Sequence, residues 1–85
     1  MKDYLRGIIS DAIDSLDFPA TEFLIEKPSQ KEHGNYSSNV ALTLTRELRR
    51  NPLEIAGEIK EALEYDTTDI AEVRVAPPGF INFFL

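Results

Sequence analysis

Apolar residues recur every three or four positions near the start of the chain, the spacing of one face of an α-helix. This stripe consists of Leu5, Ile8, Ile9, Ala12, Ile13 and Leu16. Asp3 is a candidate cap for the helix, and Pro19 disfavours helical backbone at the residue before it. We therefore predict a first helix that ends within residues 17–19.

Two further helices are predicted in the middle of the chain. The second helix follows a cap at Ser38 or Asn39, and its inward positions are Val40, Ala41, Leu44 and Leu48. Asn51 and Pro52 then mark a break and a restart, because Asn is a good N-cap and Pro suits the first helical position. The third helix is predicted to end near Tyr65, with Ile55, Ala56, Ile59, Ala62 and Leu63 pointing inward.

Alternating apolar and polar residues predict four extended segments, because successive side chains of a strand point to opposite faces. These segments cover residues 21–27, 35–38, 70–76 and 80–85. The resulting order is helix, strand, short strand, helix, helix, strand, strand. This order favours an α+β fold, with a small antiparallel sheet of about four strands and three helices packed on one of its faces.

The composition fits one small soluble domain, because 42% of the 85 residues are hydrophobic and 28% are charged. No apolar run approaches the roughly 20 residues that span a bilayer, and we expect no secretory signal and no membrane partner. The absence of cysteine excludes disulfides and thiolate metal sites, and it fits a cytoplasmic location. We expect a monomer.

The charge balance argues against a free-standing nucleic-acid binder. The net charge is −6, from 15 acidic and 9 basic side chains, whereas such binders normally carry a basic surface that displaces counterions from phosphates. Any contact with nucleic acid is therefore expected to be local, or to be helped by a neighbouring domain.

The residues offer little for catalysis. His33 is the only histidine, and we interpret it as a turn or surface residue that is a weak basis for a metal site. Ser37 and Ser38 lack the flanking glycines of a nucleophile elbow, and the four isolated glycines form no phosphate-binding loop. We predict no catalytic, metal or cofactor site within this chain.

The last strand carries the most informative chemistry. One face holds Ile81, Phe83 and Leu85, which we predict to be core, and the other holds Phe80, Asn82 and Phe84. One interpretation is a buried strand with the Asn82 amide satisfied by backbone. The other is a recognition surface, because an aromatic ring can stack on an unstacked base for about 1–3 kcal/mol while an amide meets the base edge.

Two other groups of residues leave alternatives open. Asn35 and Tyr36 lie in a segment rich in hydrogen-bonding residues, which either shapes a turn and a helix cap or forms part of a docking surface. Arg46, Arg49 and Arg50 form either a solvated helix end or a patch that contacts phosphate.

Three separated blocks of sequence, residues 33–42, 51–56 and 75–83, resemble the N-terminal additional domain of arginyl-tRNA synthetase. The resemblance implies a small antiparallel sheet packed on helices, which contacts the outer corner of tRNA where the D-loop lies. The family's base-contacting aromatic and polar residues match Phe80 and Asn82. Two positions depart from the family's pattern: Pro77 stands where Gly is usual, and Asn35 stands where an acidic residue is common.

The resemblance also implies a role within a larger enzyme. Residues 1–85 would be the N-terminal domain of a class I arginine–tRNA ligase, with the catalytic and anticodon-binding domains outside this chain. ATP and Mg would then belong to the parent enzyme, and the partners of this domain would be tRNA(Arg) and its own catalytic domain. The expected tRNA-binding residues are Phe80, Asn82, Tyr36, Arg49 and Arg50.

Two other functions remain open from the sequence. The chain could be a stand-alone protein-interaction module that docks a partner by strand addition along its aromatic C-terminal strand. It could instead be a structural domain that only packs on a catalytic body.

Overall fold

The computed structural model describes all residues, 1–85, and contains the predicted helices and strands in the predicted order. The helices are α1 (Lys2–Ser15), α2 (Val40–Leu48) and α3 (Pro52–Ala62), and a short 3-10 helix is η1 (Lys31–His33). The strands are β1 (Ile25–Glu26), β2 (Tyr36–Ser38), β3 (Glu72–Ala76) and β4 (Phe80–Phe84).

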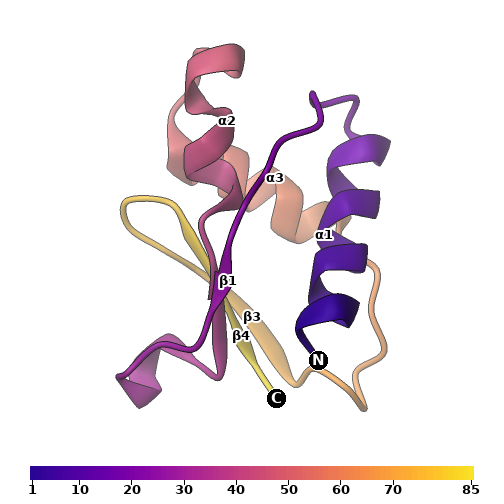
Figure 1. Cartoon of the computed structure of the whole chain (residues 1–85), viewed down its shortest axis with the longest axis vertical. Helices are drawn as coiled ribbons and strands as arrows, with labels where there is room; N and C mark the ends of the chain where they lie inside the picture. Colours follow the sequence, from indigo (N-terminus) through magenta and orange to yellow (C-terminus); the bar gives the residue numbers. More distant parts are fainter.

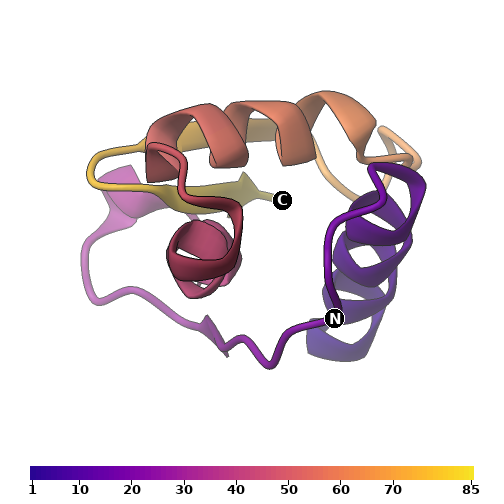
Figure 2. The ribbon, with the colours of Figure 1, turned by 90° about the horizontal axis from the view of Figure 1, so that it is seen from above.

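The four strands form one antiparallel sheet in the order β1-β2-β4-β3, and the helices pack against one face of it (Figure 1). In Figure 2, α3 runs over the β3–β4 hairpin, and α1 stands beyond the far end of that hairpin. This arrangement confirms the predicted α+β fold. None of the helices has the length and apolar character needed to cross a membrane.

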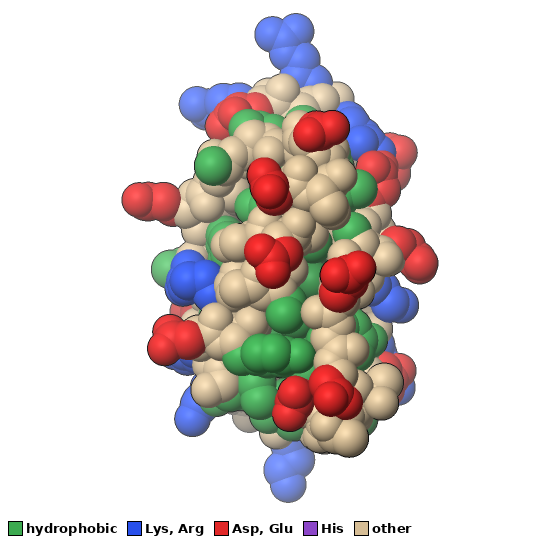
Figure 3. All heavy atoms as spheres, turned by 90° about the vertical axis from the view of Figure 1, so that its right-hand side faces the viewer, with side chains coloured by type: hydrophobic (Ala, Val, Ile, Leu, Met, Phe, Trp, Pro, Cys, Tyr) green, Lys and Arg blue, Asp and Glu red, His purple; other side chains and the backbone are tan.

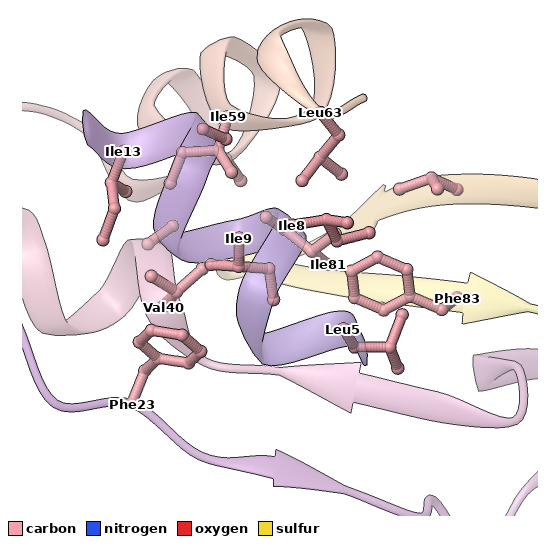
Figure 4. Packing of buried hydrophobic residues seen from close by; sticks show 14 of the residues in the cluster. Leu5, Ile8, Ile9, Ile13, Phe23, Val40, Ile59, Leu63, Ile81 and Phe83 are labelled. Atoms are coloured by element: carbon pink, nitrogen blue, oxygen red, sulfur yellow. The ribbon is translucent and has the colours of Figure 1, made fainter. Parts of the chain in front are cut away.

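The hydrophobic core lies between the sheet and the helices. It contains 18 buried residues, five of which form the apolar stripe of α1 from Leu5 to Ile13. Figure 4 shows Ile81 and Phe83 of β4 pointing towards Ile8 and Leu5 of α1. Burial of Ile81 and Phe83 confirms that this face of the last strand belongs to the core.

The prediction that Leu85 belongs to the core is wrong, because this residue is 48% exposed. β4 ends at Phe84, so the final residue lies beyond the ladder and beyond the cover of the helices. Its N–H donates to the side-chain oxygen of Asn35 at 2.9 Å, which holds the backbone while the side chain faces solvent.

Several element ends also differ from prediction. The segment expected to be a strand over residues 21–27 contributes only two residues to β1, because its one partner, β2, has only three. The third helix ends at Ala62 rather than near Tyr65, because Leu63 turns into an extended conformation and is buried there. The residue at the N-cap position of α1 is Met1, so Asp3 lies in the first turn and does not cap the helix.

Candidate functional site

The face of the sheet that carries no helices displays the polar part of β4. β4 lies inside the sheet, and Asn82 has Ser37 of β2 opposite it on one side and Arg74 of β3 on the other. Because side chains alternate along a strand, these three residues share one face with Phe80. This face is opposite to that of Ile81 and Phe83 in the core.

A cavity of about 350 Å³ opens on this face. The β1–β2 connection forms one wall with Lys27, Pro28 and His33, and the β3–β4 turn forms another with Ala76 and Pro77. The remaining lining residues belong to the strands: Glu26, Ser37, Phe80 and Asn82. The fold therefore brings the two residues singled out in the last strand, Phe80 and Asn82, to a single cavity.

Asn82 is only 4% exposed, and its side chain has a defined partner. The Ser37 hydroxyl donates to Asn82 Oδ1 at 2.8 Å. The amide is thus held by a neighbouring side chain rather than by backbone. No fully buried side-chain nitrogen or oxygen in the chain lacks a hydrogen-bond partner.

Tyr36 lies elsewhere. It is opposite Phe83 in the β2–β4 pairing and packs against the core, so it points to the other face of the sheet from Asn82. The Lys27 ammonium lies 5.8 Å from the centre of the Tyr36 ring. Because Lys27 also lines the cavity, Tyr36 contacts a cavity residue without lining the cavity itself.

The arginines lie at the junction between α2 and α3. Arg49 is exposed and ends α2 in a left-handed conformation with φ 52°. Arg50 pairs with Glu58 and, at 3.8 Å, with Glu54. This junction packs against the β3–β4 turn, because a Cβ placed on Gly79 of that turn would be 2.6 Å from Cβ of Pro52.

Arg74 of β3 is the charged residue next to Asn82 on the sheet. Arg74 Nε lies 2.6 Å from a carboxylate oxygen of Glu72, and its guanidinium lies 5.0 Å from the centre of the Phe84 ring. The hydrogen bond from Arg74 lowers the pKa of Glu72. This cation is therefore already paired.

Residues 3–85 match the family model described as the arginyl tRNA synthetase N terminal domain. The chain belongs to this family.

Relatives of this N-terminal domain are much longer proteins. The chain is 43% identical over 86 residues to an arginine–tRNA ligase of Prosthecochloris aestuarii, and the match covers 100% of the chain but 16% of that protein. It is 37% identical over 83 residues to an arginine–tRNA ligase of Listeria welshimeri, covering 98% of the chain and 15% of that protein. The arginyl-tRNA synthetase structure from Thermus thermophilus superposes with a TM-score of 0.84 at 26% identity, covering 100% of this chain and 14% of that one.

The structure of this N-terminal domain removes the basis for strand addition along β4. That strand is paired on both sides, with β2 and with β3, so it has no free edge to offer to another chain. The comparisons give the interaction-module alternative no support either, because the relatives are ligases.

The sequence did not single out Lys27 and Ser37 as functional residues of this N-terminal domain. Lys27 directly follows β1, and no local pattern signals that it lines a cavity. The alternation of the short strand could have placed Ser37 on the helix-free face, but its partner Asn82 becomes known only from the register with β4. The structure contains no group of three or more potential metal-ligating side chains.

Proposed function

We propose that this domain contributes to tRNA recognition by an arginine–tRNA ligase, with the cavity on the helix-free face holding one unstacked base of tRNA(Arg) near its D-loop corner. The observation that carries the proposal is the convergence of Phe80 and Asn82 on one cavity, together with the membership of this family. The half-buried Phe80 ring offers a stacking platform, and the Asn82 amide offers a polar group for the base edge.

The charges around the cavity are mixed. Lys27 and Glu26 both line it, and the Lys27 ammonium lies over the ring of Tyr36, which points to the other face of the sheet. The remainder of the surface is net acidic, so most of the affinity for tRNA comes from other parts of the ligase. In this scheme the domain adds discrimination at one corner of the tRNA.

The two arginines differ in this proposal. Arg49 is exposed at the end of α2, which makes it a candidate for a phosphate contact. Arg50 is paired with Glu54 and Glu58, so its main role is to tie the α2–α3 junction to α3. Tyr36 points to the other face of the sheet, where the Lys27 ammonium lies over its ring, so it takes no direct part in holding the base.

The chain spans 16% of the length of the Prosthecochloris ligase. We therefore assign binding of arginine, ATP and Mg to the remainder of the ligase, with no cofactor held by this domain. Its other partner is the catalytic domain of the same ligase.

The test is to replace Phe80 or Asn82 by Ala in a ligase that carries this domain. Loss of a base stack of about 1–3 kcal/mol lowers kcat/KM for tRNA arginylation by about 5- to 150-fold for Phe80→Ala. Asn82→Ala lowers it in the same direction. Arginine- and ATP-dependent steps that do not need the D-loop corner remain nearly unchanged, and steady-state aminoacylation kinetics with each substrate varied measure the difference.

Phe84→Ala is the matched control, because Phe84 lies on the same face of β4 and is half-buried like Phe80 but does not line the cavity. It is expected to leave kcat/KM for tRNA within about twofold. Unchanged kinetics in both Phe80→Ala and Asn82→Ala would contradict the proposal.

A further inference from the structure

The end of β4 is held by Asn35, the residue directly before β2. The Asn35 backbone N–H donates to the carbonyl oxygen of Phe83 at 2.8 Å, and its side-chain oxygen accepts from the Leu85 N–H at 2.9 Å. Asn35 therefore bonds to the chain on both sides of Phe84. Because the backbone pairing of β2 with β4 begins only at Tyr36, the Asn35 side chain extends the pairing beyond the strand.

Little else holds Leu85. It lies beyond the last residue of β4, and its side chain is about half exposed, so packing does not fix it. On the β3 side, the last hydrogen bond runs from the Ala71 N–H to the carbonyl oxygen of Phe84 at 2.7 Å, one residue earlier. The bond to Asn35 is the only hydrogen bond that Leu85 makes.

Asn35 also belongs to the segment that lines the cavity. His33, two residues earlier, is one of the lining residues. Gly34 lies against β4 between them, because a Cβ placed on it would be 2.6 Å from the carbonyl oxygen of Phe83. A movement of this segment at the cavity alters the bond between Asn35 and Leu85, so the cavity wall and the end of β4 are linked.

We propose that Asn35 is a positioning residue that fixes the direction in which the chain leaves β4, and with it the orientation of the domain relative to the rest of the ligase. This inference rests on the proposed function, in which the rest of an arginine–tRNA ligase follows this N-terminal domain. A fixed exit limits the orientations that the two parts can take, and it lowers the entropy lost when both engage one tRNA. Asn35 thus aids arginylation without contacting tRNA.

The substitutions Asn35→Asp and Asn35→Leu form a matched pair for the test. Both side chains are close to Asn in shape, but only Asp keeps an oxygen that can accept from the Leu85 N–H. Because Asp also adds a negative charge, Gln30→Glu serves as its control. This change adds the same charge at an exposed position of the same connection and alters no side-chain hydrogen bond.

The first measurement is hydrogen exchange of the Leu85 N–H in the 85-residue chain, followed by NMR. We expect exchange in Asn35→Leu to be roughly two- to tenfold faster than in the wild type, the value of one neutral hydrogen bond. Asn35→Asp is expected to keep the protection, and the amides inside β4 keep theirs in both variants. Equal exchange of the Leu85 N–H in all three proteins would overturn the inference, whether or not the domain binds tRNA.

The second measurement is steady-state arginylation by a ligase that carries this domain. Asn35→Leu is expected to lower kcat/KM for tRNA roughly two- to tenfold and to leave KM for arginine and ATP unchanged, while Asn35→Asp behaves like Gln30→Glu. In a Phe80→Ala background, Asn35→Leu has no further effect, because a domain that no longer holds tRNA need not be oriented. A merely structural role would lower activity by the same factor in both backgrounds.

The outcomes separate the two proposals. If Phe80→Ala lowers kcat/KM for tRNA but Asn35→Leu does not, or acts equally in both backgrounds, the positioning role fails and the proposed function stands. If Phe80→Ala and Asn82→Ala both leave the kinetics unchanged, the proposed function fails, and the inference fails with it.

Discussion

Gly34 connects η1 to β2 with a backbone conformation that other residues rarely adopt, φ 83° and ψ −169°. It also lies against the end of β4, because a Cβ placed on it would be 2.6 Å from the carbonyl oxygen of Phe83. The neighbouring His33 is part of the cavity wall. Gly34 thus sets the path of the segment that closes one side of the cavity.

We predict that Gly34→Ala destabilises the domain by at least about 1–3 kcal/mol, because the backbone strain and the close approach to Phe83 add. Denaturant unfolding monitored by circular dichroism measures the change. Gly7→Ala is the control, since nothing lies within 4 Å of a Cβ at that exposed helical position. That change is expected to stabilise the domain by about 0.5–1 kcal/mol, and equal effects at both positions would contradict the argument.

Asparagine shows what could be predicted at the scale of single residues. The N-cap role of Asn51 followed from the sequence and is confirmed, because its side chain accepts from the Leu53 N–H at 2.8 Å. Asn39 occupies the N-cap position of α2, but the hydroxyl of Ser38 is the group that accepts from the Val40 N–H. The Asn39 side chain accepts from the Leu24 N–H instead. The local role was visible because both partners lie within two residues, whereas a contact across 15 residues depends on the tertiary fold.

At the scale of elements, the turn between α3 and β3 is stabilised by its own side chains. The Asp66 carboxylate accepts hydrogen bonds from the Thr68 backbone N–H at 2.9 Å and from the Thr68 hydroxyl at 2.8 Å. These bonds favour the ionised form, so they lower the pKa of Asp66 below its usual value of 3.8. A depressed pKa makes the stabilisation present at neutral pH and lost as the pH falls through that pKa.

We predict that an NMR titration of the Asp66 carboxyl gives a pKa below 3.8, the ordinary value for this group. Thr68→Ala removes the hydroxyl bond but keeps the backbone bond, which is the larger cause of the shift. The pKa of Asp66 in that variant is expected to lie between the wild-type value and the ordinary one. A wild-type pKa at or above the ordinary value would show that the turn does not hold the carboxylate in this way.

The kind and order of the elements could be predicted from the sequence, but their lengths could not. Periodicity identifies which face of β4 is buried because the pattern is local to the strand. The length of β1 depends instead on how many residues β2 offers for pairing. For the same reason Phe80 and Asn82 could be placed on a shared face from the sequence, whereas the Lys27 and His33 wall beside them required the fold.

At the scale of the whole molecule, charged side chains are distributed unevenly over the surface. Figure 3 shows carboxylates spread over the side of the molecule on which α1 lies. The cavity opens on the sheet face that carries no helices, with Glu26, Lys27 and His33 among its lining residues. The acidic side repels phosphates, so under the proposed function we expect tRNA to approach the sheet face.

We predict that the 85-residue chain alone binds tRNA weakly at low salt and loses this binding at moderate salt, because few of its cations are available to phosphates. Arg49→Gln is expected to weaken the low-salt binding further. Arg50→Gln is the matched comparison, and it has a smaller effect because Arg50 is already paired with Glu54 and Glu58. Filter binding or calorimetry over a salt series measures all three proteins. Tight binding by the chain that resists salt would contradict this prediction.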